Sequence, residues 1–262
     1  MTMKVSDRVY CRIGEDGDSN NGFIICDDCC IVVDTATFPD QTREDLKNLK
    51  KVTQKEIKFL INTHCHGDHT LGNMYFSDII AHKSCYQTLK ERISFYMGYI
   101  KQDEENKKRF EGLTIKLPTI TFSDEISLHL ASEIVLTHYG GHTAGSSTVY
   151  IPEDKVLFSG DLLFVGSHPY LGDADIQQWI VALKELLKLD IQSIVPGHGE
   201  LCDKEEFKTH ITYLQTFYDN LKDLKQKYSK EKICENIDLM QLPDLGKKER
   251  IVRNVEAQYD KI

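Results

Sequence analysis

The stretch of sequence that decides the fold is Thr63-His64-Cys65-His66-Gly67-Asp68-His69. It continues a dense apolar run of strand length, residues 57–63. Side chains two apart on an extended chain point to the same side, so His64 and His66 can reach one cation. Gly67 permits a sharp turn, after which Asp68 and His69 project into the same cavity. This spacing of imidazoles and a carboxylate predicts a site for zinc, iron or manganese.

Three later segments carry the same kinds of side chain. His142 lies in the glycine-rich stretch Gly-Gly-His-Thr-Ala-Gly-Ser-Ser, Asp161 ends the apolar strand Phe-Ser-Gly-Asp, and His198 lies in Pro-Gly-His-Gly. Glycines beside such residues let the backbone approach closely, as a crowded metal site requires. Each segment alone is a weak signal. Together, all at strand ends, they predict one joint site.

The ordered motifs HxHxDH, GGHTAGS, SGD and PGHG resemble the metallo-β-lactamase superfamily, over residues from about 5 to 200. The resemblance implies an α/β fold, a four-layer αββα sandwich with the metals at one edge. It also implies a ligand set like that of glyoxalase II, with Asp161 bridging two ions. The first ion would be held by His64, His66 and His142, and the second by Asp68, His69 and His198. All seven positions are filled, which argues for a catalytic member.

Such a site implies a metal-dependent hydrolase. Two cations roughly 3.5–4 Å apart share a water and lower its pKa to near 7, giving a metal-bridging hydroxide. Asp68 and Asp161 are the candidate catalytic residues, because either could orient this nucleophile and accept its proton. We expect two divalent ions per chain, zinc first, with iron or manganese open. The expected substrate is a small molecule of the ester, thioester or lactone type.

The branch of the superfamily stays open. Antibiotic-cleaving members usually lack the aspartate found at Asp161, and nuclease members often carry large insertions, for which the 36 residues between Asp161 and His198 leave no room. Glyoxalase II-like chains have a Gly-Cys-Gly-type loop where this chain has residues 164–170, and quorum-signal lactonases have a tyrosine at the position of Phe164. The alternatives are a persulfide dioxygenase-like enzyme with one iron, a phosphodiesterase and, less favoured, a β-lactamase or a non-catalytic metal-binding protein.

The loop after Asp161 should line the cleft, because functional residues favour loops on rigid scaffolds. We therefore predict Phe164, His168 and Tyr170 as substrate contacts. Asp34, at a strand end, could orient a ligand histidine or be an ordinary turn residue. Asp175, three residues before Gln178, is expected to cap a helix.

Composition places the chain among ordinary globular proteins, with 262 residues, 40% hydrophobic and 28% charged. A net charge of -9 disfavours binding to nucleic acid or to anionic membranes. No apolar run approaches the roughly 18 residues of a membrane span, and no secretion signal is visible. We therefore expect a cytoplasmic protein whose eight cysteines are reduced. The Cys26-Asp-Asp-Cys29-Cys30 stretch is interpreted as a hairpin with its turn at Asp27-Asp28.

The order of strands and helices occurs twice, which predicts two sheet-plus-helix halves packed sheet to sheet. Residues 1–202 would form the metallo-β-lactamase-like domain, and residues 203–262 would form helices packed on it. The aromatic-rich residues 83–112 could be a lid, a homodimer face or core. Asn21-Gly22 is a candidate turn. Strands are expected at residues 9–13, 22–26, 30–34, 57–63, 79–82, 119–122, 126–130, 134–138, 147–151, 156–159 and 191–195. Helices are expected at 41–52, 83–112, 175–189, in the tail from 202 onward and at 247–259.

Overall fold

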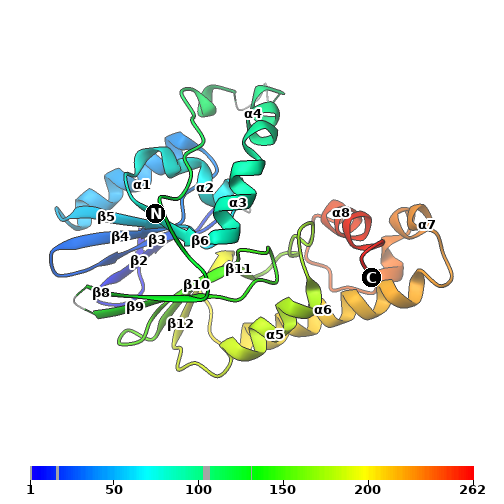
Figure 1. Ribbon diagram of the computed structural model, residues 1–262. Coiled ribbons are helices and arrows are strands. Elements are labelled where there is room, and N and C mark those ends of the chain that lie inside the picture. Colours follow the sequence, from blue (N-terminus) through cyan, green and yellow to red (C-terminus); the bar gives the residue numbers. More distant parts are fainter. Residues whose placement is uncertain (1, 16–17, 103–106, 131) are drawn as a thin grey trace.

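The computed structural model describes residues 2–15, 18–102, 107–130 and 132–262 (Figure 1). The strands are β1 (Thr2–Lys4), β2 (Val9–Arg12), β3 (Asn21–Ile25), β4 (Cys29–Val33), β5 (Glu56–Ile61), β6 (Ile79–His82), β7 (Ile120–Phe122), β8 (Glu125–Leu130), β9 (Ser132–His138), β10 (Ser147–Ile151), β11 (Val156–Phe164) and β12 (Ser193–His198). The α-helices are α1 (Pro39–Val52), α2 (Gly67–Thr70), α3 (Lys83–Glu91), α4 (Ile93–Gln102), α5 (Ile176–Leu186), α6 (Glu205–Leu224), α7 (Lys230–Glu235) and α8 (Glu249–Gln258). Short 3-10 helices are η1 (Leu71–Tyr75), η2 (Lys107–Phe110) and η3 (Ile237–Met240).

The strands form two sheets that face each other. Within the described residues, one sheet has the order β1-β2-β3-β4-β5-β6-β7 and the other the order β12-β11-β10-β9-β8. Apolar side chains from both sheets meet in one buried cluster, to which Ile24 and Ile31 contribute from the first sheet and Leu136 and Val149 from the second. Each such side chain stabilises the fold by about 1.5–3 kcal/mol relative to an exposed position.

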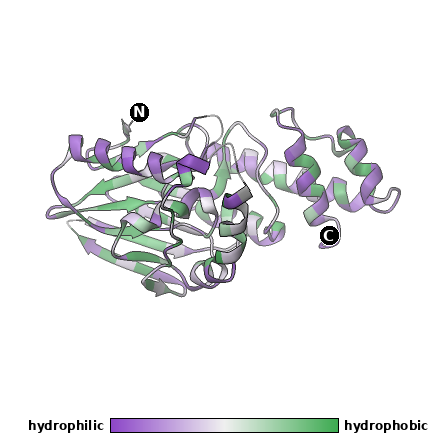
Figure 2. Ribbon diagram, turned by 90° about the horizontal axis from the view of Figure 1, so that it is seen from above, coloured by the Kyte–Doolittle hydropathy of each residue, from purple (hydrophilic) through white to green (hydrophobic). Residues whose placement is uncertain are grey.

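Helices cover the outer face of each sheet. On the first sheet, Leu46 and Leu49 of α1 pack over Val32 and Phe23. On the second, Trp179 of α5 belongs to a buried cluster shared with β11. Figure 2 shows strands coloured mainly as hydrophobic between helices with hydrophilic outer faces. The predicted α/β sandwich with its helix, sheet, sheet, helix layers is confirmed.

The C-terminal helices α6, α7 and α8 follow the second sheet in the chain and share a buried cluster with it. Figure 1 shows α6 leading away from the sandwich, with α7 and α8 near its far end. Apolar side chains of α6 and α8, such as Phe217 and Val255, belong to the same buried cluster as Trp179. The division into domains at residue 202 stays a prediction. Among the described residues, no helix combines the length and apolar character needed to cross a bilayer.

The two turns predicted near β3 have different outcomes. The hairpin with its turn at Asp27-Asp28 is confirmed, since the Cys26 amide donates to the Cys29 carbonyl at 2.9 Å and β3 pairs with β4. The turn predicted at Asn21-Gly22 is wrong, because both residues lie inside β3, opposite Arg12 and Cys11. Glycine is needed at position 22 for close packing, since a Cβ there would collide with the Tyr10 carbonyl.

Candidate metal centre

The fold brings all seven predicted ligands to one edge of the sandwich. The chain leaves β5 at Ile61 and supplies His64 and His66, and the short α2 then carries Asp68 and His69. His142 comes from the loop between β9 and β10, and His198 is the last residue of β12. β11 and β12 run parallel, so their carboxyl ends meet at the same edge.

Asp161 lies inside a strand, whereas the sequence predicted it at a strand end. The strand predicted to end at residue 159 continues as β11 to Phe164, and Asp161 lies inside it. The pairing of β11 with β12 shifts register between Phe158 and Gly160 and again between Gly160 and Phe164. Gly160 takes φ +50°, so the strand is locally irregular and turns the Asp161 side chain toward the edge.

One group of ligand atoms comes from His64, His66, His142 and Asp161, all within 4.8 Å of one another. His142 Nε2 lies 3.0 Å from His66 Nδ1. Asp161 Oδ2 lies 3.3 Å from His142 Nε2 and 3.6 Å from His64 Nε2. Three imidazole nitrogens and a carboxylate oxygen thus converge on one point.

A second group comes from Asp68, His69, Asp161 and His198, again within 4.8 Å. Asp161 Oδ1 lies 3.0 Å from His69 Nε2 and 3.4 Å from His198 Nε2. Asp68 Oδ2 lies 3.3 Å from His198 Nε2. The two carboxylate oxygens of Asp161 therefore face two different sets of histidines, which is the arrangement expected of a bridging ligand.

The electrostatics agree with a cation site. Burial lowers the pKa of His142 to about 3 and that of His64 well below its ordinary value, so both rings are neutral and carry a free lone pair. Burial opposes ionisation of Asp161, yet the charges of His198 and His69 hold its pKa well below the usual range. Burial also opposes protonation of His198, but Asp161 and Asp68 raise its pKa to about 10. The carboxylates thus attract positive charge to this point.

Asp34 orients two of these histidines. Its Oδ2 accepts a hydrogen bond from His69 Nδ1 at 2.9 Å, which turns His69 Nε2 toward Asp161. Asp34 also accepts from the Thr63 amide and hydroxyl, and Thr63 Oγ1 lies 3.1 Å from His64 Nδ1. Because its oxygens accept these hydrogen bonds, Asp34 orients the ligand histidines and is not itself counted among the ligands. Of the two interpretations left open by the sequence, these hydrogen bonds support the orienting one, and the Asp34 backbone takes a left-handed φ of 57° just after β4.

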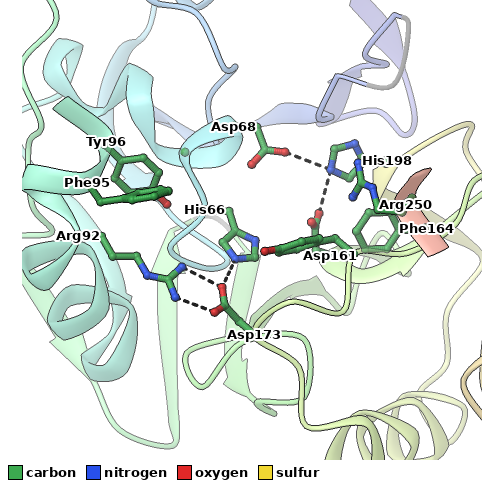
Figure 3. A pocket seen from close by; sticks show the side chains of 12 residues that line it. His66, Asp68, Arg92, Phe95, Tyr96, Asp161, Phe164, Asp173, His198 and Arg250 are labelled. Carbon is green, nitrogen blue, oxygen red and sulfur yellow. Dashed lines mark hydrogen bonds and ion pairs between the residues drawn. The ribbon is translucent and has the colours of Figure 1, made fainter. Parts of the chain in front are cut away.

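Asp173 orients a third ligand histidine, a role that the sequence prediction missed. Asp173 accepts a hydrogen bond from His66 Nε2 at 2.7 Å (Figure 3). This bond leaves His66 Nδ1 facing His142 Nε2, 3.0 Å away. Arg92, at the end of α3, holds Asp173 with two bonds of 2.8 and 2.6 Å. Burial opposes ionisation of Asp173, but Arg92 and His66 lower its pKa below the usual range. The sequence signal was the position of Asp173 in the predicted cleft loop, whereas nothing marked Arg92.

The residues present fit metal ions. The buried atoms His64 Nε2, His69 Nε2 and Asp161 Oδ1 have no hydrogen-bond partner in the described part of the chain. Buried polar atoms without partners are costly, and a cation at the centre would satisfy all of them. A Cβ on Gly197 would collide with the Asp161 carboxylate, so the glycine is required for the ligands to converge. Imidazole and carboxylate donors suit zinc, iron or manganese.

The cluster opens into a pocket of about 610 Å³. Phe164 and Tyr170, two predicted substrate contacts, line it, as do Asp68, Asp161 and Asp173. The third, His168, does not belong to the lining. It is 4% exposed and its Nδ1 lies 2.9 Å from the Tyr213 hydroxyl, so the loop turns this side chain toward α6. Its interpretation as a substrate contact is corrected to that of a buried structural residue.

The aromatic segment at residues 83–112 supplies one wall of the pocket. Arg92, Phe95 and Tyr96 line the cavity, and Phe95 is 65% exposed. Leu89 and Ile100 are buried, so the segment also provides core. Residues 103–106 of this range lie outside the described part of the chain. Whether it is also a lid or a dimer face stays a prediction.

The comparisons with known proteins agree with this geometry. A family model described as the metallo-beta-lactamase superfamily matches residues 14–198. The chain belongs to the metallo-β-lactamase superfamily, most of whose members are metal-dependent hydrolases.

Individual relatives are distant. A metallo-beta-lactamase type 2 of Bacillus cereus is 28% identical over 182 residues, covering 66% of this chain and 64% of that protein. A beta-lactamase-like protein 2 homolog of Caenorhabditis elegans is 29% identical, covering 66% and 53%. A linear primary-alkylsulfatase of a Pseudomonas strain is 25% identical, covering 65% and 39%. The chain thus spans less than two thirds of the length of each of these three relatives. The activities in their names are therefore statements about those proteins and not about this chain.

Solved structures share the fold. A metallo-beta-lactamase from Pontibacter korlensis has a TM-score of 0.64 at 22% identity, covering 82% of this chain and 98% of that one. The DIM-1 metallo-beta-lactamase has a TM-score of 0.65 at 23% identity, covering 82% and 97%. At this identity, the likeness concerns the fold alone.

Proposed function

We propose that this protein is a two-metal hydrolase that cleaves an ester, thioester or lactone-type small molecule. The observation that carries the proposal is the position of Asp161, whose Oδ2 faces His64 and His142 while its Oδ1 faces His69 and His198. One carboxylate with two separate histidine sets is suited to joining two cations.

The ligand assignment follows from which atoms converge. His64, His66 and His142 would hold one divalent ion, Asp68, His69 and His198 the other, and Asp161 would bridge them. Zinc is the preferred ion, because histidine and carboxylate ligands suit it, and iron or manganese would accept the same donors. When bound, the ions supply Lewis acidity, which polarises the substrate oxygen and lowers the pKa of an attacking water.

Among the side chains of the pocket, Asp68 is the proposed proton acceptor. Asp68 lies at the pocket surface with 32% of its side chain exposed and its Oδ2 beside His198. Burial opposes its ionisation, but the charge of His69 and the contact with His198 hold its pKa below the usual range. Asp68 is therefore ionised at neutral pH and can accept a proton from an attacking water at Oδ2.

The walls would position the substrate. Phe164 ends β11 and Tyr170 lies in the loop that follows it, while Phe95 and Tyr96 belong to α4. These rings offer apolar surface to the carbon skeleton of a small molecule, while the reacting carbonyl faces Asp68 and Asp161. A pocket of about 610 Å³ is of the size that holds metabolite-sized ligands.

The test is a substrate panel assayed with protein purified without chelator: a thioester, a lactone, a phosphodiester, a β-lactam and a persulfide with oxygen-uptake detection. We expect turnover of the thioester or lactone, its loss on metal removal, and its recovery on adding zinc. Turnover of the phosphodiester alone would instead identify a phosphodiesterase. Oxygen uptake with one bound iron would identify a dioxygenase and refute the two-metal hydrolase.

A further inference from the structure

A second arginine reaches the pocket from the far end of the chain. Arg250 lies in the first turn of α8, yet it lines the same cavity as Asp68 and Phe164. In Figure 3, Arg250 lies on the side of His198 and Phe164, while Arg92 lies on the opposite side with Phe95 and Tyr96. The C-terminal helices therefore contribute directly to the place where a substrate would bind.

The two arginines differ in what they bind. Arg92 is neutralised by Asp173 through two hydrogen bonds. The backbone amide of Arg250 donates to the Lys247 carbonyl, but for its guanidinium the structure records no hydrogen bond or ion pair with any described residue. Its guanidinium carbon lies 5.5 Å from the centre of the Tyr170 ring. A cation–π contact of this kind attracts a guanidinium without using its N–H groups, which stay available to a ligand.

Among the residues that the structure describes, the carboxylates of the pocket are all engaged elsewhere, so none of them is paired with Arg250. The oxygens of Asp68 and Asp161 face the histidines of the proposed metal centre, and Asp173 is engaged by Arg92 and His66. A planar guanidinium with free donors, partly removed from water at the wall of a pocket, suits a carboxylate, which it can bind with two parallel hydrogen bonds.

We propose that Arg250 is a specificity-determining residue that binds a carboxylate of the substrate. The substrate class is then narrower: an ester, thioester or lactone that carries a free carboxylate away from the bond that is cleaved. This inference rests on the proposed function for the identity of the reacting group. In this proposal, α8 recognises the negative charge of the substrate, and the metal centre at the edge of the sheets cleaves the bond.

Calorimetric binding of small acids tests the subsite without turnover. The probes are the straight-chain dicarboxylates from malonate to adipate, each compared with the monocarboxylate of equal carbon number. Both kinds of acid can place one carboxylate at the metals, so the difference between them reports the second carboxylate. We expect at least one dicarboxylate to bind metal-loaded protein at least tenfold more tightly than its monocarboxylate.

Arg250→Ala should abolish that advantage and leave monocarboxylate binding unchanged. Arg250→Gln, which keeps most of the side chain's volume, should do the same and guards against misfolding of the alanine variant. Arg253→Ala is the matched control, because Arg253 lies three residues further along α8, is exposed and does not line the pocket. It should retain the full advantage.

The proposal is overturned if no dicarboxylate binds more tightly than its monocarboxylate, or if Arg253→Ala loses as much affinity as Arg250→Ala. Failure of the proposed function would look different. A protein that binds a dicarboxylate through Arg250 but cleaves no ester, thioester or lactone would refute the hydrolase and leave the carboxylate subsite standing.

Discussion

Replacing Asp173 by alanine tests how the structure orients a metal ligand. The change removes three hydrogen bonds at once, of 2.7 Å to His66 and of 2.8 and 2.6 Å to Arg92. Without its partner, the His66 ring can turn its Nδ1 away from His142. Loss of such a supporting carboxylate typically weakens metal binding about 10–100-fold, and we expect a decrease of that size.

The same change has a modest effect on stability. The side chains of Arg92 and Asp173 are 34% and 27% exposed, so water screens their ion pair in part. We expect the free energy of unfolding to fall by about 1–2 kcal/mol. For a chain of this size, each 1 kcal/mol corresponds to roughly 2–4 °C in melting temperature.

The control is Asp175→Ala in the same loop. Asp175 caps α5 by accepting from the Gln178 amide at 3.0 Å, and losing such a cap costs about 1 kcal/mol. Both variants should therefore melt a few degrees early, as seen by circular dichroism. Only Asp173→Ala should lose metal to a competing chromogenic chelator. Equal metal affinity in the two variants would refute the orienting role of Asp173.

Three further predictions use the same protein. Asp161→Ala should release one of the two ions and lower turnover at least on the order of a hundredfold, with an unchanged circular dichroism spectrum; full activity would exclude a bridging role. Thiol titration of denatured, non-reduced protein should count all eight cysteines, which are unpaired in the structure, and a lower number would indicate a disulfide. Burial and the neighbouring His138 lower the pKa of His82 to about 4, so the folded state resists protonation. The stability advantage of the wild type over His82→Gln should then be complete above pH about 6.5 and shrink as the pH falls toward 4, whereas a constant difference would show that His82 does not titrate differently on folding.

The sequence predicted the sandwich because its strands are short apolar runs and its helices have a clear 3.6-residue period. The metal cluster was predictable for a related reason. Each ligand directly follows a buried strand or lies within a few residues of a glycine that makes room for it, as Gly197 does for Asp161. These are local signals, and strand ends meet at a common edge whatever the exact loop path.

What the sequence could not predict depends on contacts between distant segments. The Arg92–Asp173 pair joins residues 81 positions apart, and neither residue has a motif around it. Arg250 reaches the pocket because α8 packs against the cleft loop, where Asn254 accepts from the Leu171 amide and donates to the Pro169 carbonyl. His168 was placed wrongly for the converse reason. It lies in the cleft loop as expected, but the Tyr213 hydroxyl on α6 provides a buried partner that turns it away from the cleft.

The metal content of the protein tests the central claim most directly. Protein purified without chelator, dialysed against metal-free buffer and measured by elemental analysis should contain two divalent ions per chain. Two ions are expected because the described ligands form two groups that share only Asp161. A reproducible value of one ion per chain that added zinc does not raise would contradict a bridged pair of metals, and with it the proposed hydrolase.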